Sequence, residues 1–473
     1  EPIEVPCLWT DEFGTPQVQS CADDAAFADG HRRFVEKRVA KLEQAEPLRR
    51  AELLLLPIKA RQKSDIRKTF AEQVRDACLR LHREHAEIDP TSGKRVSFGI
   101  VRMANIDPLF DVAHALHRLG APENTRIHLC VYHARFPLAQ RSAIEFMLDT
   151  ALNRRDPQAV WRHSAVRAML DAHRERDHLC VVLASPVCEV GRDWDADWAV
   201  AEPSSMRALI QLAGRVQRHR RKPPKSPNVL VFDTNLKALE EPGGQKAAFV
   251  RPGFEKQSMD GRFLLASHHL SMLWPEAERQ RIDATSRIQP RPLGERQPRH
   301  SWVDLEQARI EASMLPLQPV PPSTSRRAAV ATSGLDRDQV APSWQFPQAA
   351  LTGVLPQQQP FRDDGRPETT LVWLPVEDEE ESKPHRVEED ARKRGQKLYV
   401  RADEMLHRVA LVPASGIYPW AAFDLTALLT EQAESLNRPL DDIARSFSVL
   451  EVPRSDNGQG WRWHPWLGFT PQR

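Results

Sequence analysis

The sequence lacks an apolar run near the roughly 20 residues that a membrane-spanning helix needs, and no segment reads as a signal peptide. The sequence also has no large excess of charge of one sign, because 66 basic and 65 acidic residues give a formal net charge of +1. A globally basic chain is therefore excluded, and any surface that binds nucleic acid must be local. We expect a cytoplasmic protein without a membrane partner.

Cysteines are few, and their spacing matches no known metal-binding or redox motif. Six cysteines among 473 residues form no CxxC pair and no cysteine–histidine spacing typical of zinc. Cys130 and Cys180 fall within apolar runs, so we expect them to be buried as small hydrophobic residues. This usage is typical of a reduced chain without disulfides, and no metal site is predicted.

Several catalytic signatures are missing as well. The sequence contains no phosphate loop of the GxxxxGK[ST] type, no acid pair of the DExH type and no histidine–aspartate nuclease signature. The pair His268–His269 is followed by no matching acidic cluster and is expected to be structural. The chain opens at Glu1 without a methionine, so we expect it to be the C-terminal part of a longer protein.

What is present, from Ser97 onwards, is an alternation of apolar runs and amphipathic segments. Strands are predicted over 97–101, 127–132, 179–184, 198–201 and 229–232. Helices are predicted over 107–119, 138–153 and 157–173, with another starting at Ser204 or Ser205. Such crossovers imply a parallel sheet covered on both faces, and the fold class is therefore α/β.

Four parts are expected along the chain. Residues 1–95 form a helical segment packed on the sheet domain, which itself spans 96–280. Residues 281–366 are rich in proline and form an irregular linker, and 367–473 form a small α+β domain. Further helices are predicted over 263–274, 302–314, 402–410, 421–435 and 440–448, and further strands over 370–375 and 398–401.

Two surface features of the last part stay open between alternatives. The acidic run Glu377–Glu381 is either a solvated loop or a surface that mimics DNA or contacts a basic partner. The aromatic end Trp461–Trp466 either packs into a core or stacks nucleic-acid bases.

The stretch Asp177–Arg221 contains the most informative chemistry. A buried strand, a loop with one glutamate and three aspartates, and a second strand lead into a helix. At helical spacing, Leu209, Leu212 and Val216 share one side, whereas the opposite side collects polar groups. The polar set is Arg207, Gln211, Arg215 and Arg218. Such a face is either solvated or directed at an anion, which planar guanidinium groups bind through two hydrogen bonds.

The order of these parts resembles a known family. Gln211–Arg218 reads QxxGRxxR and resembles motif VI of superfamily 2 helicases, and Ala184–Asp195 resembles motif V. The pattern HxRF…R…E at His133–Glu145 is similar to that of CRISPR-associated helicase–nucleases of type I. Together these motifs look most like the subtype I-F form, in which a Cas2-like domain and an HD nuclease precede the helicase.

The resemblance implies a RecA-like fold for 96–280, namely the second helicase domain with motifs IV, V and VI. Gln211, Arg215 and Arg218 would face ATP as the catalytic set, with an arginine finger typically worth ~10³–10⁵ in rate. Gly191, Asp193 and Asp195 would form the nucleotide side of motif V. The residues expected to face single-stranded DNA are Arg102, His133, Arg135, Arg141 and Ser185.

The resemblance also implies an activity: an ATP-dependent, single-strand-translocating DNA helicase–nuclease that degrades invading DNA. ATP and Mg²⁺ would be completed by the missing first RecA-like domain, and a transition metal would lie in the nuclease domain, so this part alone should be inactive. Implied partners are single-stranded DNA, a crRNA-guided Cascade-like surveillance complex, a Cas1-type integrase and phage anti-CRISPR inhibitors. The alternative is a non-catalytic RecA-like adaptor that only binds nucleic acid or protein.

Overall fold

The computed structural model describes residues 5–10, 17–58, 60–241, 246–257, 261–314, 367–376, 379, 381–390, 395–455 and 458–472. The Pro-rich stretch after residue 314 and most of the acidic run at 377–381 lie outside these residues, so those two predictions are not addressed.

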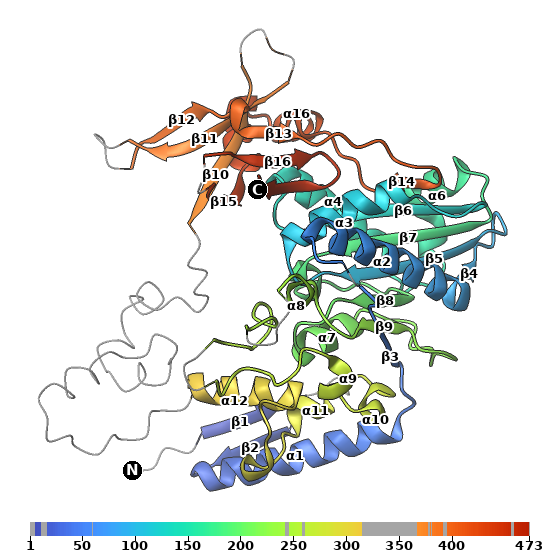
Figure 1. Ribbon diagram of the computed structural model, residues 1–473, viewed down its shortest axis with the longest axis vertical. Helices are drawn as coiled ribbons and strands as arrows, with labels where there is room; N and C mark the ends of the chain where they lie inside the picture. Colours follow the sequence, from blue (N-terminus) through green and yellow to red (C-terminus); the bar gives the residue numbers. More distant parts are fainter. Residues whose placement is uncertain are drawn as a thin grey trace, which may run out of the picture.

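An eight-stranded sheet forms the centre of the molecule (Figure 1). Its order is β14-β6-β7-β5-β8-β9-β3, every neighbouring pair along this path is parallel, and β4 pairs antiparallel with β5. The strands are β3 (Ala51–Leu54), β4 (Glu87–Ile88), β5 (Arg95–Arg102), β6 (Thr125–Tyr132), β7 (Asp177–Ala184), β8 (Trp198–Ala201), β9 (Val229–Phe232) and β14 (Ile417–Pro419). The predicted α/β class with a parallel sheet is confirmed.

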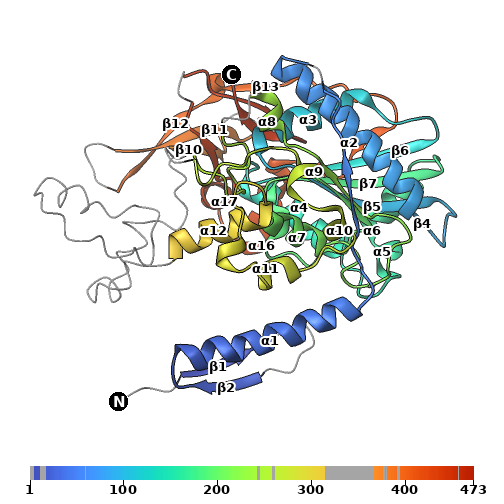
Figure 2. The same cartoon turned by 60° about the horizontal axis from the view of Figure 1, so that its bottom comes forward.

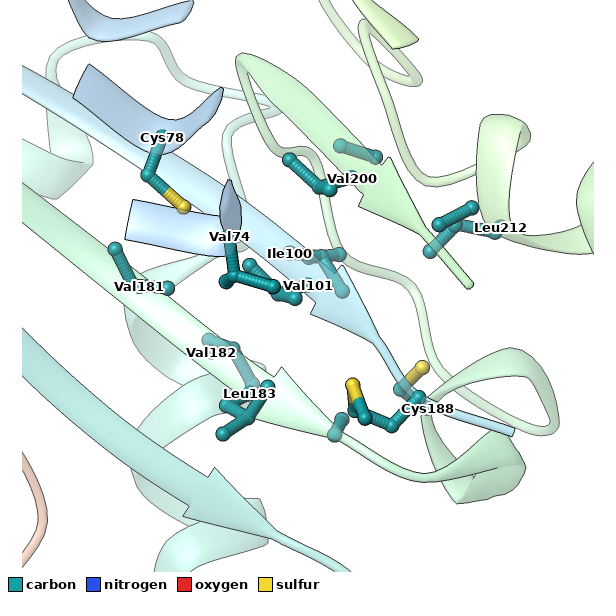
Figure 3. Close-up of a cluster of buried hydrophobic side chains, with 14 of the residues drawn as sticks. Val74, Cys78, Ile100, Val101, Val181, Val182, Leu183, Cys188, Val200 and Leu212 are labelled. Atoms are coloured by element: carbon teal, nitrogen blue, oxygen red, sulfur yellow. The ribbon is translucent and has the colours of Figure 1, made fainter. Parts of the chain in front are cut away.

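Helices cover both faces of this sheet. On one face lie α2 (Lys63–His85) and α3 (Ile106–Leu119), and on the other lie α4 (Leu138–Ala151) and α6 (Ser164–Asp171) (Figure 1). The short helix α5 (Ala159–Arg162) precedes α6, and its Trp161 contacts Phe98 of β5. Val74 of α2 lies next to Val101 of β5 in the buried core, and Cys78 is buried further along the same helix (Figure 3). Because burying a valine-sized side chain stabilises by about 1.5–3 kcal/mol, this apolar layer holds the strands in a fixed register.

The C-terminal part is rich in strands and packs against α4. One sheet is antiparallel and has the order β12-β11-β10-β15; a second sheet has the order β13-β16-β17 and is mixed, because β13 pairs parallel with β16. The bounds are β10 (Glu368–Leu374), β11 (Lys383–Glu389), β12 (Lys397–Arg401), β13 (Leu406–Arg408), α16 (Leu425–Leu436), α17 (Leu440–Phe447), β15 (Leu450–Pro453), β16 (Trp461–His464) and β17 (Gly468–Pro471). Ala139 of α4 shares an apolar cluster with Val372 and Leu429, so this small α+β unit is attached through its own core.

The first part of the chain is less purely helical than predicted. The hairpin of β1 (Val5–Trp9) and β2 (Gln17–Cys21) packs with α1 (Asp24–Gln44) beside the sheet domain (Figure 2). The strand β3 pairs with β9, so residues before 95 supply both a strand and the covering helix α2 to the central sheet. The division of the chain into four parts stays a prediction.

The segment after β9 contains short helices. They are α8 (Leu236–Glu240), α9 (Leu270–Leu273), α10 (Glu276–Arg279), α11 (Thr285–Ile288), η2 (Leu293–Glu295) and α12 (Trp302–Met314). The helix predicted at 302–314 is confirmed as α12, but the helix predicted at 263–274 shrinks to α9. Buried carboxylates take the backbone donors instead, because Glu255 accepts the N–H of Leu265 and Asp233 accepts that of Ser271.

Two other predicted helices are wrong in part or in whole. The segment 157–173 breaks into α5 and α6 at His163, whose backbone is extended at φ −63° and ψ 126°. The segment 402–410 forms only the 3-10 turn η4 (Asp403–Met405) and then β13. Parallel pairing of β13 with β16 provides backbone partners that the local sequence could not reveal.

Candidate functional site

The carboxyl ends of the central strands meet at one level. Arg102 of β5 is opposite Ala184 of β7 and Ala201 of β8, and Ala184 is also opposite Tyr132 of β6. The loops that follow these strands therefore leave from one edge of the sheet, where ligands of open parallel sheets bind.

The arginine-bearing helix α7 (Met206–Ala213) begins as predicted but ends earlier. The hydroxyl of Ser205 accepts a hydrogen bond from the N–H of Ala208 at 3.2 Å and caps its start. After Gly214 the chain leaves the helix to pair with Ala196, which donates to the carbonyl of Arg215 at 2.7 Å. Because of this turn, Arg215 and Arg218 do not lie on the helical face predicted for them.

Arg215 is a buried cation without a carboxylate partner among the described residues. Its side chain donates one hydrogen bond to the backbone carbonyl of Glu189 at 2.8 Å, and its Nε has no partner. Burial, and then the nearby charge of Arg218, lower the pKa of Arg215. An unpaired guanidinium in a buried site favours the arrival of an anion.

Arg218 lies at the surface and is paired with Asp193. The same carboxylate accepts a hydrogen bond from Arg155 at 2.7 Å and lies 3.2 Å from Nε2 of His219. Burial opposes ionisation of Asp193, but the hydrogen bonds from Arg218 and His219 outweigh it, and its pKa falls to about 2. Gln211 is half-buried, and no side-chain hydrogen bond is found for it within the described chain.

Gly191 and Asp195, two further residues of the motif V loop, differ in their exposure to solvent. Gly191 is exposed at φ +69°, a left-handed conformation that favours glycine, and Val190 beside it is 64% exposed. Asp195, in contrast, has no exposed surface and binds the backbone of residues 218–220. The position of Asp195 therefore does not support its predicted contact with nucleotide.

Of the residues predicted to face DNA, Arg102 is internal. Its guanidinium forms an ion pair with Glu189 at 2.7 Å and donates to the carbonyl of Glu202 and the hydroxyl of Ser204. Burial raises the pKa of Glu189 in spite of the charge of Arg102. Since Arg102 is 1% exposed, it holds the sheet edge together and has no surface to offer a phosphate. Ser185 is buried next to it at 4% exposure.

The loop after β6 lies under the C-terminal hairpin. Nε2 of His133 donates to the carbonyl of Leu467 at 2.9 Å, and burial lowers the pKa of His133 to about 3, so its ring is neutral. Arg135 forms an ion pair with Asp107, and its carbonyl accepts the N–H of Phe469.

Arg141 is the most open member of the predicted DNA-facing set. Its side chain is 32% exposed, and its ion pair with Glu145 is long at 3.8 Å. At the aromatic end of the chain, Trp461 and Trp463 pack into the C-terminal apolar cluster, which agrees with the first alternative, and stacking on nucleic-acid bases stays untested. Trp461 is buried in the C-terminal core, whereas Trp463 is half-buried and stacks on Phe469.

The residues that sequence reasoning missed are the buried partners of this region. Arg220 lies in the basic run Arg215–Lys225, where a solvated surface is the ordinary expectation, yet its side chain is 1% exposed. It contacts Asp195, Asp197 and Glu87, and Arg154 contacts the last two of these. No local signal could have found these pairs, because their members are separated by 23 to 133 positions.

Two searches over the described part of the chain are negative. No group of three or more histidine, cysteine, aspartate or glutamate side chains is arranged to hold a metal ion. No helix among these residues has the length and apolar character needed to cross a membrane. The six cysteines are free, and Cys130 and Cys180 are buried as expected.

Two family models match separate parts of the chain. Residues 95–221, which span β5 to the turn after α7, match the family described as CRISPR-associated nuclease/helicase Cas3, C-terminal. Residues 373–471 match the family described as CRISPR-associated Cas3 subtype I-F/YPEST-like, C-terminal domain. The first of these matches covers the strands from β5 to β8 and the helix α7 of the central sheet region.

Similar proteins extend this match over nearly the whole chain. The sequence is 40% identical over 98% of its length to a CRISPR-associated nuclease/helicase Cas3 of subtype I-F/YPEST from Pseudomonas aeruginosa. It is 35% identical over 99% of its length to the protein of the same name from Pectobacterium atrosepticum. The chain spans 40% of the length of each relative. It belongs to the Cas3 subtype I-F/YPEST family and corresponds to the C-terminal part of its members.

Solved structures give a weaker likeness. A crystal structure described as T. fusca Cas3-ATP is 19% identical and covers 40% of this chain and 19% of that one, with a TM-score of 0.29. This value is too low to support an argument about individual residues.

Proposed function

We propose that the chain is part of an ATP-dependent helicase–nuclease that moves along single-stranded DNA, unwinds it and degrades invading DNA in type I-F CRISPR interference. Its family membership and the order of motifs V and VI support this proposal. Within it, the chain supplies the arginines of motif VI and one half of a DNA groove. The phosphate loop, the acid pair for Mg²⁺ and the nuclease metal site belong to parts of the protein that precede it, so the chain alone is inactive.

The observation that carries the proposal is the state of Arg215. A guanidinium that is 9% exposed, lacks a carboxylate partner among the described residues and retains an unused Nε donor is costly unless an anion completes it. The triphosphate of ATP is such an anion, and phosphoryl transfer develops further charge on its oxygens. Gln211 and Arg218 would bind the same nucleotide, with Arg218 exchanging Asp193 for phosphate.

On the DNA side, the residues divide into those that contact the strand and those that shape the groove. Arg141 is open enough to contact phosphates, and such contacts make binding salt-dependent and largely independent of sequence. Arg102, His133 and Arg135 act by holding the loops and the C-terminal hairpin in place. A surveillance complex, a Cas1-type integrase and anti-CRISPR inhibitors are the proposed protein partners.

The test is DNA-stimulated ATP hydrolysis by the full-length protein with Arg215→Ala. We expect a loss of at least ~10³-fold, because arginine fingers typically contribute ~10³–10⁵ in rate. Arg207→Ala is the matched control, since Arg207 is exposed on the same helix but stands outside QxxGRxxR. Equal hydrolysis by Arg215→Ala and the wild type would instead favour a non-catalytic adaptor that only binds nucleic acid or protein.

A further inference from the structure

The backbone of residues 218–220 folds around one buried carboxylate. Oδ1 of Asp195 accepts the N–H of Arg218 at 3.1 Å, and its Oδ2 accepts the N–H groups of His219 and Arg220, both at 3.2 Å. Successive backbone N–H groups that point inward form a concave anion site. Here the anion is a side chain of the protein itself, so the path of this turn depends on Asp195.

Arg220 closes the same site from the other side. Two of its nitrogens donate to Asp195 at 3.0 Å, and a terminal nitrogen donates to Asp197 at 2.6 Å. Arg154 joins Asp197 at 2.7 Å and Glu87 at 2.6 Å. The guanidinium groups are almost fully buried and every carboxylate has at least one of them as partner, so the group resists rearrangement.

The turn is also tied down on its N-terminal side. Ala196 donates to the carbonyl of Arg215 at 2.7 Å and accepts the N–H of Gln217 at 3.0 Å. Gln217 has φ +50°, a left-handed conformation that costs free energy for a residue with a side chain. The loop that contains Asp195 therefore holds the backbone on both sides of Arg215 and Arg218.

We propose that Asp195, together with Arg220, is a positioning residue that sets the backbone of Arg215 and Arg218 for phosphoryl transfer, without contacting the nucleotide. This inference rests on the proposed function. It differs from the sequence prediction for Asp195, because a carboxylate with no exposed surface and five protein donors has no capacity left for a ligand.

The experiment compares Asp195→Asn with Glu87→Gln in the full-length protein. Both changes remove one carboxylate charge from the same group; Glu87 contacts only the side chain of Arg220 in this turn, whereas Asp195 also accepts the backbone N–H groups of residues 218–220. We expect kcat for ATP hydrolysis to fall by ~10²-fold in Asp195→Asn with KM for ATP changed less than about threefold, because small misplacements of reacting groups cost about this much. Glu87→Gln should retain kcat within about threefold of the wild type.

A second measurement does not depend on activity. Hydrogen exchange of the amides of residues 218–220 in this chain should be slow in the wild type and in Glu87→Gln. It should be at least about tenfold faster in Asp195→Asn, since exchange reports local opening. If Asp195→Asn does not fold, Arg220→Lys replaces it, because lysine keeps the charge but cannot form the paired contacts to Asp195.

Three results would overturn the inference: unchanged kcat in Asp195→Asn, an equal loss of kcat in both variants, or amide protection that survives the change at 195. Measuring Arg215→Ala in the same series distinguishes a failure of the positioning role from a failure of the proposed function. If Arg215→Ala keeps its activity, the proposed function fails; if only Arg215→Ala loses it, the positioning role alone fails.

Discussion

Two turns at the same edge of the sheet carry basic residues for which anion binding was predicted, and they are held in opposite ways. In the turn after α7, Arg215 has no carboxylate partner among the described residues and Arg218 is 43% exposed. In the loop after β6, Arg135 is paired with Asp107 and His133 is buried under Leu467. Basic side chains thus remain able to bind an anion in the first turn, whereas in the second they are already paired within the protein. The reason is that a hairpin remote in sequence covers only the second turn.

Among the variants that compare these two turns, the largest effect is expected at Arg218. In the full-length protein, Arg218→Ala should lower DNA-stimulated ATPase by at least ~10²-fold while DNA binding persists, because Arg218 is the second guanidinium of motif VI. Arg135→Ala should leave ATPase within about threefold of the wild type, since its partner is Asp107 and an internal ion pair affects stability before rate. Equal losses in the two variants would remove the contrast between the turns.

The contact between the hairpin and the loop after β6 should be sensitive to Gly468. A Cβ at this position would lie 2.4 Å from Cε1 of His133 and 2.6 Å from the carbonyl oxygen of Arg135, and the residue has φ +74°. Gly468→Ala should therefore destabilise the chain by more than about 2 kcal/mol in urea unfolding.

The control for Gly468→Ala is Gly458→Ala. Gly458 has a similar φ of +64° but no atom within 4 Å of an added Cβ, so only the backbone strain remains, at about 1 kcal/mol. If both variants lose the same amount of stability, the packing of the hairpin on His133 is not the cause.

Acid should lower the free energy of unfolding of the chain. Burial lowers the pKa of His133 to about 3 and that of His117 and His464 to about 4, so the folded state keeps these rings neutral. Unfolding releases them to take up protons near pH 6.5; stability is therefore full above that pH and declines as pH falls towards 4. Each such group costs about 1.4 kcal/mol per pH unit in this window.

Urea unfolding between pH 7.5 and 4.5 measures this dependence. In His133→Gln, the free energy of unfolding should fall less steeply with decreasing pH, because one proton fewer is taken up on unfolding. An identical pH dependence in the variant and the wild type would show that His133 does not contribute to it.

The smallest effect is expected at Arg155, which pairs with Asp193 at the surface beside Arg218. Its side chain is 72% exposed, and exposed ion pairs contribute at most about 1 kcal/mol. Arg155→Ala should leave thermal unfolding nearly unchanged at physiological salt. A large loss of stability would mean that the surface around Arg218 is more rigid than its exposure indicates.

The sequence by itself determined the parallel α/β sheet, most of its strands and the start of α7 at Ser204 or Ser205, because apolar periodicity and helix capping are local properties. It also singled out Arg215 and Arg218 through the order of its motifs, but it placed them on a helix that in fact ends at Ala213. These features need only neighbouring residues to specify them.

Only the tertiary structure decided which side chains remain accessible. Arg102, His133 and Asp195 have the residue types of an anion or nucleotide site, yet Glu189, Leu467 and Arg220 occupy them from remote positions in the chain. The end of α7, the strand β13 and the addition of β14 to the sheet were decided in the same way. Hydrogen-bond donors pair with the acceptors that lie near them in the folded chain. Local periodicity of the sequence does not predict which remote residues become neighbours.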